Sequence, residues 1–215
     1  MEAASLHAGG TAHAHDSAHD DHHGPPAANQ SSRVEPQLLG MLLFIISEIM
    51  VFGAFFTAYF FIRVVQGEEW FPIGEMHLPK GVAGINTAIL LTSSVTLHMA
   101  TIAVRKDKRG PLKWWMFVTA LLGAIFLGIQ INEYRVLTQE GITPQGMSQA
   151  TIFFSLTGLH GAHVLIGLIL LTIVTVRAFR GHFTPEEHRG LEIPGIYWHF
   201  VDVMWVIVYS SVYLL

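Results

Sequence analysis

Five long apolar runs limit what this chain can fold into. They extend over residues 38–65, 84–104, 114–131, 151–176 and 193–215. A helix rises about 1.5 Å per residue, so each run is long enough to cross a hydrocarbon core of roughly 30 Å. The third run is only just long enough. A segment in lipid must satisfy its own backbone hydrogen bonds, and these runs lack the alternation of barrel strands. The sequence therefore predicts an all-α bundle of five transmembrane helices.

The basic residues predict how the bundle is oriented. Nine of the twelve Lys and Arg residues lie in the N-terminal tail and in the second and fourth connections: Arg33, Arg105, Lys106, Lys108, Arg109, Lys113, Arg177, Arg180 and Arg189. Loops that stay on the inner side of a membrane are rich in Lys and Arg. We therefore expect the N-terminus inside and the C-terminus outside.

Composition excludes several classes of site. The chain is 51% hydrophobic and 13% charged, as expected where lipid is the main solvent. It has no cysteine, which excludes disulfides, iron–sulfur clusters, thiolate zinc and a cysteine nucleophile. The net charge is −4, and the basic residues form short clusters beside apolar runs. This distribution argues against a nucleic-acid partner.

Residues 1–36 have a composition unlike that of the transmembrane domain expected over residues 37–215. They lack the features of a secretory signal, so we treat them as part of the mature protein. Their Ala, Asp and Gly content predicts a disordered, solvated tail. Histidine-rich tracts bind Cu, Ni or Zn incidentally, and metal capture or pH sensing is the alternative role. We assign no site to the tail histidines, which are His7, His13, His15, His19, His22 and His23.

Three ionisable residues are predicted near the middle of the membrane. Glu48 lies about 15 Å from the inner face, and His160 and His163 lie roughly 14 and 18 Å from the outer face. An ionisable side chain there costs at least roughly 2.5 kcal/mol, so each needs a partner or a function. Glu48 is expected to be a neutral or histidine-paired structural carboxyl, or a group that takes part in proton movement.

A second candidate cluster is predicted nearer the inner face. His98 and His199 both lie about 9 Å from that face, and Asp202 lies one turn deeper, at about 14 Å. The pairs His160/His163 and His199/Asp202 are spaced i, i+3, so each pair shares one helix face. Such spacing permits a metal or haem ligand set. We favour buried hydrogen-bonding groups that join helices, with His199 and Asp202 connected to His98.

Four stretches resemble subunit III of the haem-copper respiratory oxidases. They are Ser47-Glu48-Ile49-Met50-Val51-Phe52, the run NTAILLTSS at Asn86–Ser94, His160-Gly161-Ala162-His163-Val164, and the run YWHFVD at Tyr197–Asp202. They fall in four of the five expected spans, and the last is the most specific. Longer members of this family have seven spans, and the five here correspond to their last five.

The resemblance implies an accessory subunit that carries no catalytic, cofactor or metal site of its own. Its place would be in a proton-translocating, oxygen-reducing cytochrome c oxidase of the bacterial inner membrane. Haem and copper would belong to partner subunits. The chain would pack directly against subunit I, contact subunit II and other members, bind phospholipid, and support proton uptake.

The resemblance also implies roles for particular residues. Glu48 is similar to the family's intramembrane glutamate, and His160 and His163 resemble its paired histidines. His199 and Asp202 resemble the polar pair of the terminal helix. Three residues at the inner end of the fourth span resemble a lipid-headgroup region, and their position suits an anionic headgroup: Arg177, Arg180 and His182.

Other functions remain open at this point. Some quinol oxidases have a short five-span third subunit, sometimes with a histidine-rich tail, although the glutamate and the NTAILLTSS stretch favour the cytochrome c branch. A small proton-coupled transporter could use Glu48 and the histidines as a relay. A metal carrier would depend on the histidine-rich tail.

Overall fold

The structure is a computed structural model that describes residues 36–67, 80–145, 147–181, 183 and 189–214. The described part is helical, and its five long helices are apolar enough to cross a membrane. This confirms the expected all-α membrane fold. The tail predicted over residues 1–36 lies outside the described residues, except for Pro36. The elements are α2 (Pro36–Gln66), α3 (Lys80–Arg105), α4 (Arg109–Gln139), α5 (Ser148–Phe179), α6 (Arg189–Tyr209) and the π-helix η3 (Ser210–Leu214).

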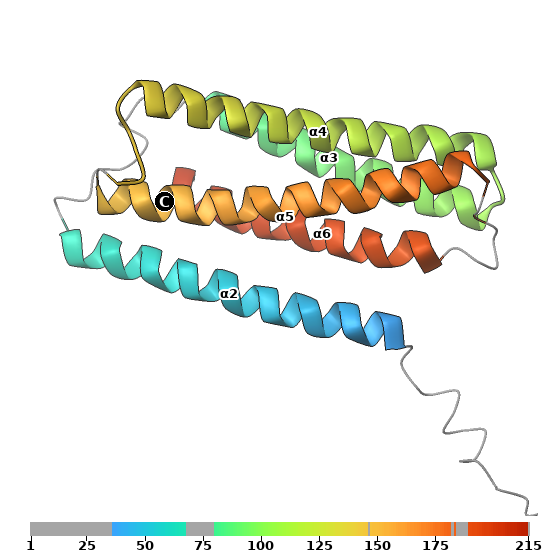
Figure 1. Ribbon diagram of the computed structural model, residues 1–215, viewed down its shortest axis with the longest axis horizontal. Coiled ribbons are helices and arrows are strands. Elements are labelled where there is room, and N and C mark those ends of the chain that lie inside the picture. The colour runs from blue at the N-terminus through green and yellow to red at the C-terminus, as the bar shows by residue number, and fades with distance from the viewer. Residues whose placement is uncertain (1–35, 68–79, 146, 182, 184–188, 215) are drawn as a thin grey trace, which may run out of the picture. The chain divides into compact units, whose positions relative to one another are not determined.

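The five helices lie side by side, with consecutive helices running in opposite directions (Figure 1). α3 packs against α4 and α6, and α4 also packs against α5. α2 packs against α5 and α6, on the opposite side of the bundle from α4. α5 and α6 therefore connect α2 to the rest of the bundle.

α4 is longer than the apolar run that predicts it. The run ends at Ile131, but the helix continues to Gln139. No glycine or proline interrupts the polar residues that follow Ile131, and the chain turns at Gly141, which has a φ of +84°. The added turns place Glu133 inside the helix, on a face that is buried against the bundle.

Trp198 of α6 is the side chain that fits three helices together. A Cβ atom built on Gly123 of α4 would lie 2.7 Å from the indole, and one built on Gly167 of α5 would lie 2.8 Å from it. The indole therefore occupies the space that these two glycines leave open. Its Nε1 donates a hydrogen bond to Ser93 Oγ of α3 at 2.9 Å.

Two further side-chain hydrogen bonds set the register between α3 and α6. Trp205 Nε1 donates to Thr87 Oγ1 at 2.9 Å, and His199 Nδ1 is 2.5 Å from Ser94 Oγ. With Ser93, these partners all belong to the NTAILLTSS stretch of α3. Hydrogen bonds between helices help to hold membrane bundles together, because lipid offers no competing partners. The polar residues of this stretch therefore join α3 to α6.

α2 has few buried contacts. Of its residues, Phe52 and Tyr59 are buried. The Tyr59 hydroxyl donates to the backbone oxygen of Ser211 at 2.9 Å, which connects α2 to η3. Most of the remaining surface is apolar, so it suits contact with lipid or with another membrane protein.

We predict that Gly167→Ala destabilises the bundle, because the added methyl group would overlap the Trp198 ring. Overpacking of this kind costs about 1–3 kcal/mol. Gly161→Ala on the same helix is the matched control, since a Cβ atom there meets no atom within 4 Å. The measurement is the thermal melting of the purified protein in its membrane complex. Equal melting temperatures for the two variants would contradict the packing role assigned to Trp198.

Candidate functional site

Glu48 of α2 and His163 of α5 form a direct contact within the membrane-spanning part. Glu48 Oε2 lies 2.8 Å from His163 Nε2, and the two side chains are 17% and 8% exposed. The sequence predicts that Glu48 and His163 lie at a similar depth in the membrane. In the structure they also form a hydrogen bond that connects α2 to α5. Each group supplies the partner that an ionisable side chain needs in lipid.

The second ring nitrogen of His163 restricts how protons are distributed in this pair. Nδ1 lies 2.8 Å from the backbone oxygen of Leu159, and a carbonyl oxygen can only accept, so Nδ1 carries a hydrogen. Nε2 then either accepts from a neutral Glu48 carboxyl or donates to an ionised one. One proton lies between the two groups in both cases. The pair stays neutral overall, so this proton can move between Glu48 and His163 without changing the net charge.

Aromatic groups surround His163. The Phe52 ring centre is 5.2 Å from that of the imidazole, and the Tyr197 hydroxyl donates to the His163 backbone oxygen at 3.3 Å. These contacts come from α2 and α6, so His163 lies where α2, α5 and α6 meet. The surrounding rings keep the Glu48–His163 hydrogen bond in an apolar environment, which strengthens it.

His160 points away from this contact. It is fully buried, with its ring 4.7 Å from the Trp205 ring and 6.0 Å from that of Phe126. Neither ring nitrogen has a hydrogen-bond partner among the residues that the structure describes. His160 and His163 therefore face different neighbours despite their i, i+3 spacing. Within the described ranges, no group of three or more His, Asp or Glu residues is arranged to hold a metal ion.

His98 and His199 line one groove between α3 and α6, with a volume of about 290 Å³. The same groove is lined by Arg105 and Glu192, which form an ion pair at 2.9 Å. The hydrogen bond of His199 goes to Ser94. The structure thus places the two predicted histidines in a common groove, with Ser94 as the direct partner of His199.

Asp202 is buried one turn further along α6. Its side chain is 3% exposed, and neither carboxyl oxygen has a hydrogen-bond partner in the described part of the chain. Ser94 is a polar side chain next to Asp202, and its hydroxyl is hydrogen-bonded to His199. His199 and Asp202 therefore share Ser94 as a neighbour, while Asp202 is absent from the groove lining.

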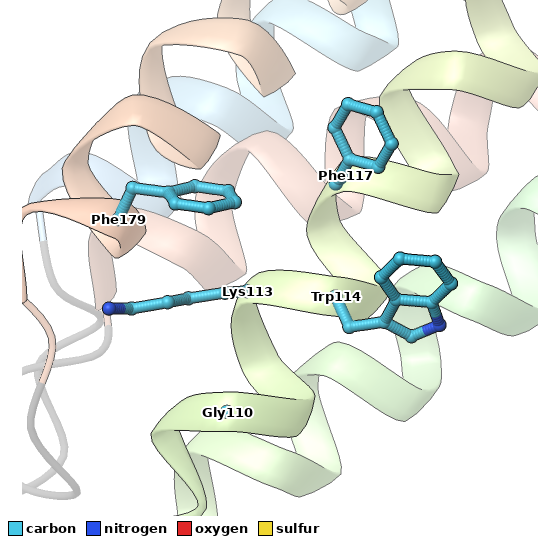
Figure 2. Close-up of a pocket in the computed structure, with 5 residues that line it drawn as sticks. All are labelled: Gly110, Lys113, Trp114, Phe117 and Phe179. Carbon is cyan, nitrogen blue, oxygen red and sulfur yellow. The ribbon is translucent and has the colours of Figure 1, made fainter.

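The basic ends of α4 and α5 border a second, apolar groove of about 390 Å³. Figure 2 shows Lys113 and Trp114 of α4 and Phe179 of α5 along its walls. Lys113 Nζ lies 5.9 Å from the centre of the Phe179 ring. Of the three predicted headgroup residues, Arg177 lies over the Phe183 ring at 5.5 Å, Arg180 is exposed at the end of α5, and His182 lies outside the described residues.

Two polar residues of α4 are buried although the apolar pattern of the sequence does not indicate it. Gln130 is 2% exposed and Glu133 is 8% exposed. Both lie at or beyond the end of the apolar run, where a polar side chain is normally solvated. Their i, i+3 spacing was the available signal, because it places them on the same helix face.

The match to a protein family covers nearly the whole chain. The family model described as cytochrome c oxidase subunit III matches residues 27–215. A cytochrome c oxidase subunit 3 from Thermostichus vulcanus is 40% identical over 183 residues, which are 83% of this chain and 87% of that protein. A Synechocystis protein of the same name is 37% identical over 90% of this chain and 78% of its own length. The human protein of that name is 35% identical over 92% of this chain and 74% of its own length.

We predict opposite outcomes for the two histidines of α5. His163→Phe removes the partner of Glu48 and is expected to destabilise the protein by about 1–3 kcal/mol. His160→Phe keeps an aromatic ring against Trp205 and removes two unsatisfied nitrogens, so its stability should be unchanged or higher. Thermal melting of the assembled complex measures both. A larger loss for His160→Phe than for His163→Phe would contradict these assignments.

Proposed function

The chain belongs to the cytochrome c oxidase subunit III family, and on that basis we propose that it is the non-redox accessory subunit of a proton-pumping terminal oxidase. It is a multi-pass membrane protein, and its partners are oxidase subunits. We further propose that it lies in a bacterial inner membrane, N-terminus inside, and packs directly against subunit I. Haem and copper belong to the partner subunits in this proposal, and this chain has no catalytic centre.

The Glu48–His163 hydrogen bond is the observation that supports a role in proton handling. It keeps one proton between two helices at 2.8 Å, in a mostly buried setting. A carboxyl and an imidazole can exchange that proton while the net charge of the pair stays at zero. We propose that the pair supports proton uptake by the complex while it also attaches α2 to α5.

The groove that contains His98 and His199 is the second element of this proposal. It lies at the Lys- and Arg-rich ends of α3 and α6, which the orientation rule places inside. An imidazole can both donate and accept hydrogen bonds, so these side chains can bind water in the groove. We propose that His98, His199 and the neighbouring Ser94 and Asp202 form a polar network on the side where protons are taken up.

Phospholipid binding is proposed for the basic ends of α4 and α5. Lys113 stands beside the apolar groove of Figure 2, with Arg177 and Arg180 at the end of the adjacent helix. Cations at a helix end attract an anionic headgroup, and an apolar groove suits an acyl chain. These features support the headgroup region that the sequence predicts, and we propose that Lys113 also belongs to it.

Co-purification tests the assignment against a small proton-coupled transporter. An accessory subunit is expected to purify with a haem-bearing, copper-containing partner. A transporter would be stable alone and would carry ions in liposomes, which would contradict the oxidase role. The adjacent subunit II distinguishes a cytochrome c oxidase from a quinol oxidase, because only the former needs a copper-containing docking domain for cytochrome c. We propose the cytochrome c form.

We predict that Glu48→Gln assembles normally and leaves oxygen consumption nearly unchanged. The Gln amide can donate to the Nε2 of neutral His163, so the helix contact survives without a transferable proton. Glu48→Leu is the contrasting variant, and it should lower the retention of this subunit in the purified complex. The measurements are turnover and subunit content. Loss of all oxidase activity in a normally assembled Glu48→Gln complex would contradict the accessory role.

We also predict that deletion of residues 1–30 leaves oxygen consumption nearly unchanged. The proposed functional contacts all lie within the transmembrane domain, and no site is assigned to the tail histidines. Oxygen uptake by membranes that contain the truncated chain measures the effect. Abolished function would favour the metal-carrier alternative.

A further inference from the structure

Four buried residues present five polar atoms that have no hydrogen-bond partner within the described chain. The atoms are Asn86 Oδ1, Gln130 Oε1 and Nε2, Glu133 Oε1 and Tyr213 Oη. Their residues are 0%, 2%, 8% and 5% exposed. We propose that these atoms bind a small cluster of ordered water molecules in the half of the bundle opposite the Lys- and Arg-rich ends.

The contacts of these residues place them in one region. Asn86 Nδ2 donates to the Phe126 backbone oxygen at 3.3 Å, and the helical N–H of Gln130 is directed at that same oxygen. Asn86 therefore lies beside the turn of α4 that leads to Gln130. Glu133 is on the same face as Gln130 one turn later, and Tyr213 is close enough to Glu133 for an electrostatic interaction.

Neighbouring side chains supply few of the missing partners. The Tyr134 hydroxyl is hydrogen-bonded to Thr157 Oγ1 at 2.6 Å and lies close enough to Gln130 to bond its amide as well. It leaves Asn86 Oδ1, Glu133 Oε1 and Tyr213 Oη without a partner. The Tyr209 ring stacks on that of Tyr213 at 5.4 Å, and the Phe153 ring lies 6.1 Å from it. These rings form apolar walls around Tyr213.

Energetics argue that something satisfies these atoms. A polar atom that is buried without a partner loses the hydrogen bonds that it makes to water when it is exposed, and this loss destabilises the folded protein. Native proteins therefore leave few buried polar atoms unpaired. A bundle that left all five unsatisfied would be strongly destabilised. An unseen hydrogen-bonding ligand removes this conflict.

The mixture of donors and acceptors selects water as that ligand. The Gln130 amide nitrogen offers hydrogens, which a cation bound among these atoms would be forced to face. An anion would face the carboxyl of Glu133. Water donates and accepts, and a buried water makes about three hydrogen bonds, so the five atoms suit about two molecules.

The π-helix η3 contributes one wall of the site. Its hydrogen bonds run from residue i to i+5, and such wide turns are rare and frequently occur at functional sites. Tyr213 lies in this wide turn and is buried. The proposed water molecules would be hydrogen-bond partners of the Glu133 carboxyl. Glu133 belongs to α4, which lies on the opposite side of the bundle from α2 and its Glu48.

A map of the assembled oxidase complex, at a resolution that shows ordered water, tests the proposal. We expect density peaks at about 2.7–3.2 Å from Gln130, Glu133 and Tyr213 atoms, with no protein atom to account for them. A dry site in which these side chains bond to one another would overturn the proposal. So would a lipid headgroup or a partner subunit's side chain in the same place.

Gln130→Leu provides a second test, with Gln139→Leu as the matched control. Gln139 is exposed at the end of the same helix. Gln130→Leu should remove at least one water peak from the map. It should also shift the infrared band of the Glu133 carboxyl. That band is identified as the one that disappears when the spectrum of Glu133→Gln is compared with that of the wild type. Gln139→Leu should change neither. An unshifted band in an assembled Gln130→Leu complex would count against the waters, and the wild-type map decides the matter if that variant does not assemble.

Discussion

The seating of Trp198 between Gly123 and Gly167 governs how the helices of this protein fit together. Lipid tails are as apolar as the helix surfaces, so apolar burial does not drive helices together as it does in water. Close steric fit and hydrogen bonds between helices must do so instead. One indole provides both, because its ring fills the space beside two glycines while its N–H reaches Ser93 on α3. A residue of α6 thereby aligns α3, α4 and α5.

α2 depends on a different kind of contact. It has two buried residues, and its polar connections to other elements include the bond from Tyr59 to Ser211 and the bond from Glu48 to His163. The group proposed to handle a proton is therefore also one of the few groups that attach this helix. Because the Glu48–His163 pair is neutral in both proton arrangements, a proton can change position within it while the attachment persists.

The polar groups of the bundle are distributed among three levels. A groove with His98 and His199 lies at the basic ends of α3 and α6, the Glu48–His163 pair lies near the middle of α2 and α5, and Gln130 and Glu133 lie toward the other end of α4. Each level lies between a different set of helices. The proposed proton-handling pair is therefore separated along the membrane from the other two sets of polar groups.

The sequence by itself determined the five spans, the all-α fold and three of the buried polar residues, which are His160, His163 and Asp202. The length of an apolar run and the cost of an unpaired backbone in lipid depend only on the local sequence. The spans and their helical structure can therefore be predicted without a tertiary structure. The YWHFVD and NTAILLTSS stretches also indicated the family. Their side chains meet across α3 and α6, where Trp198 bonds to Ser93 and His199 to Ser94.

Only the tertiary structure decided which helix each polar residue faces. Helical periodicity places His160 and His163 on one face, but it does not reveal that His163 meets Glu48 while His160 lies against Trp205. Periodicity likewise does not reveal that the direct hydrogen-bond partner of His199 is Ser94. Glu133 was missed because hydropathy ends the third span at Ile131, whereas helix continuation and packing bury the next turn. Local sequence sets the face of a helix, and the packing of distant helices sets what that face contacts.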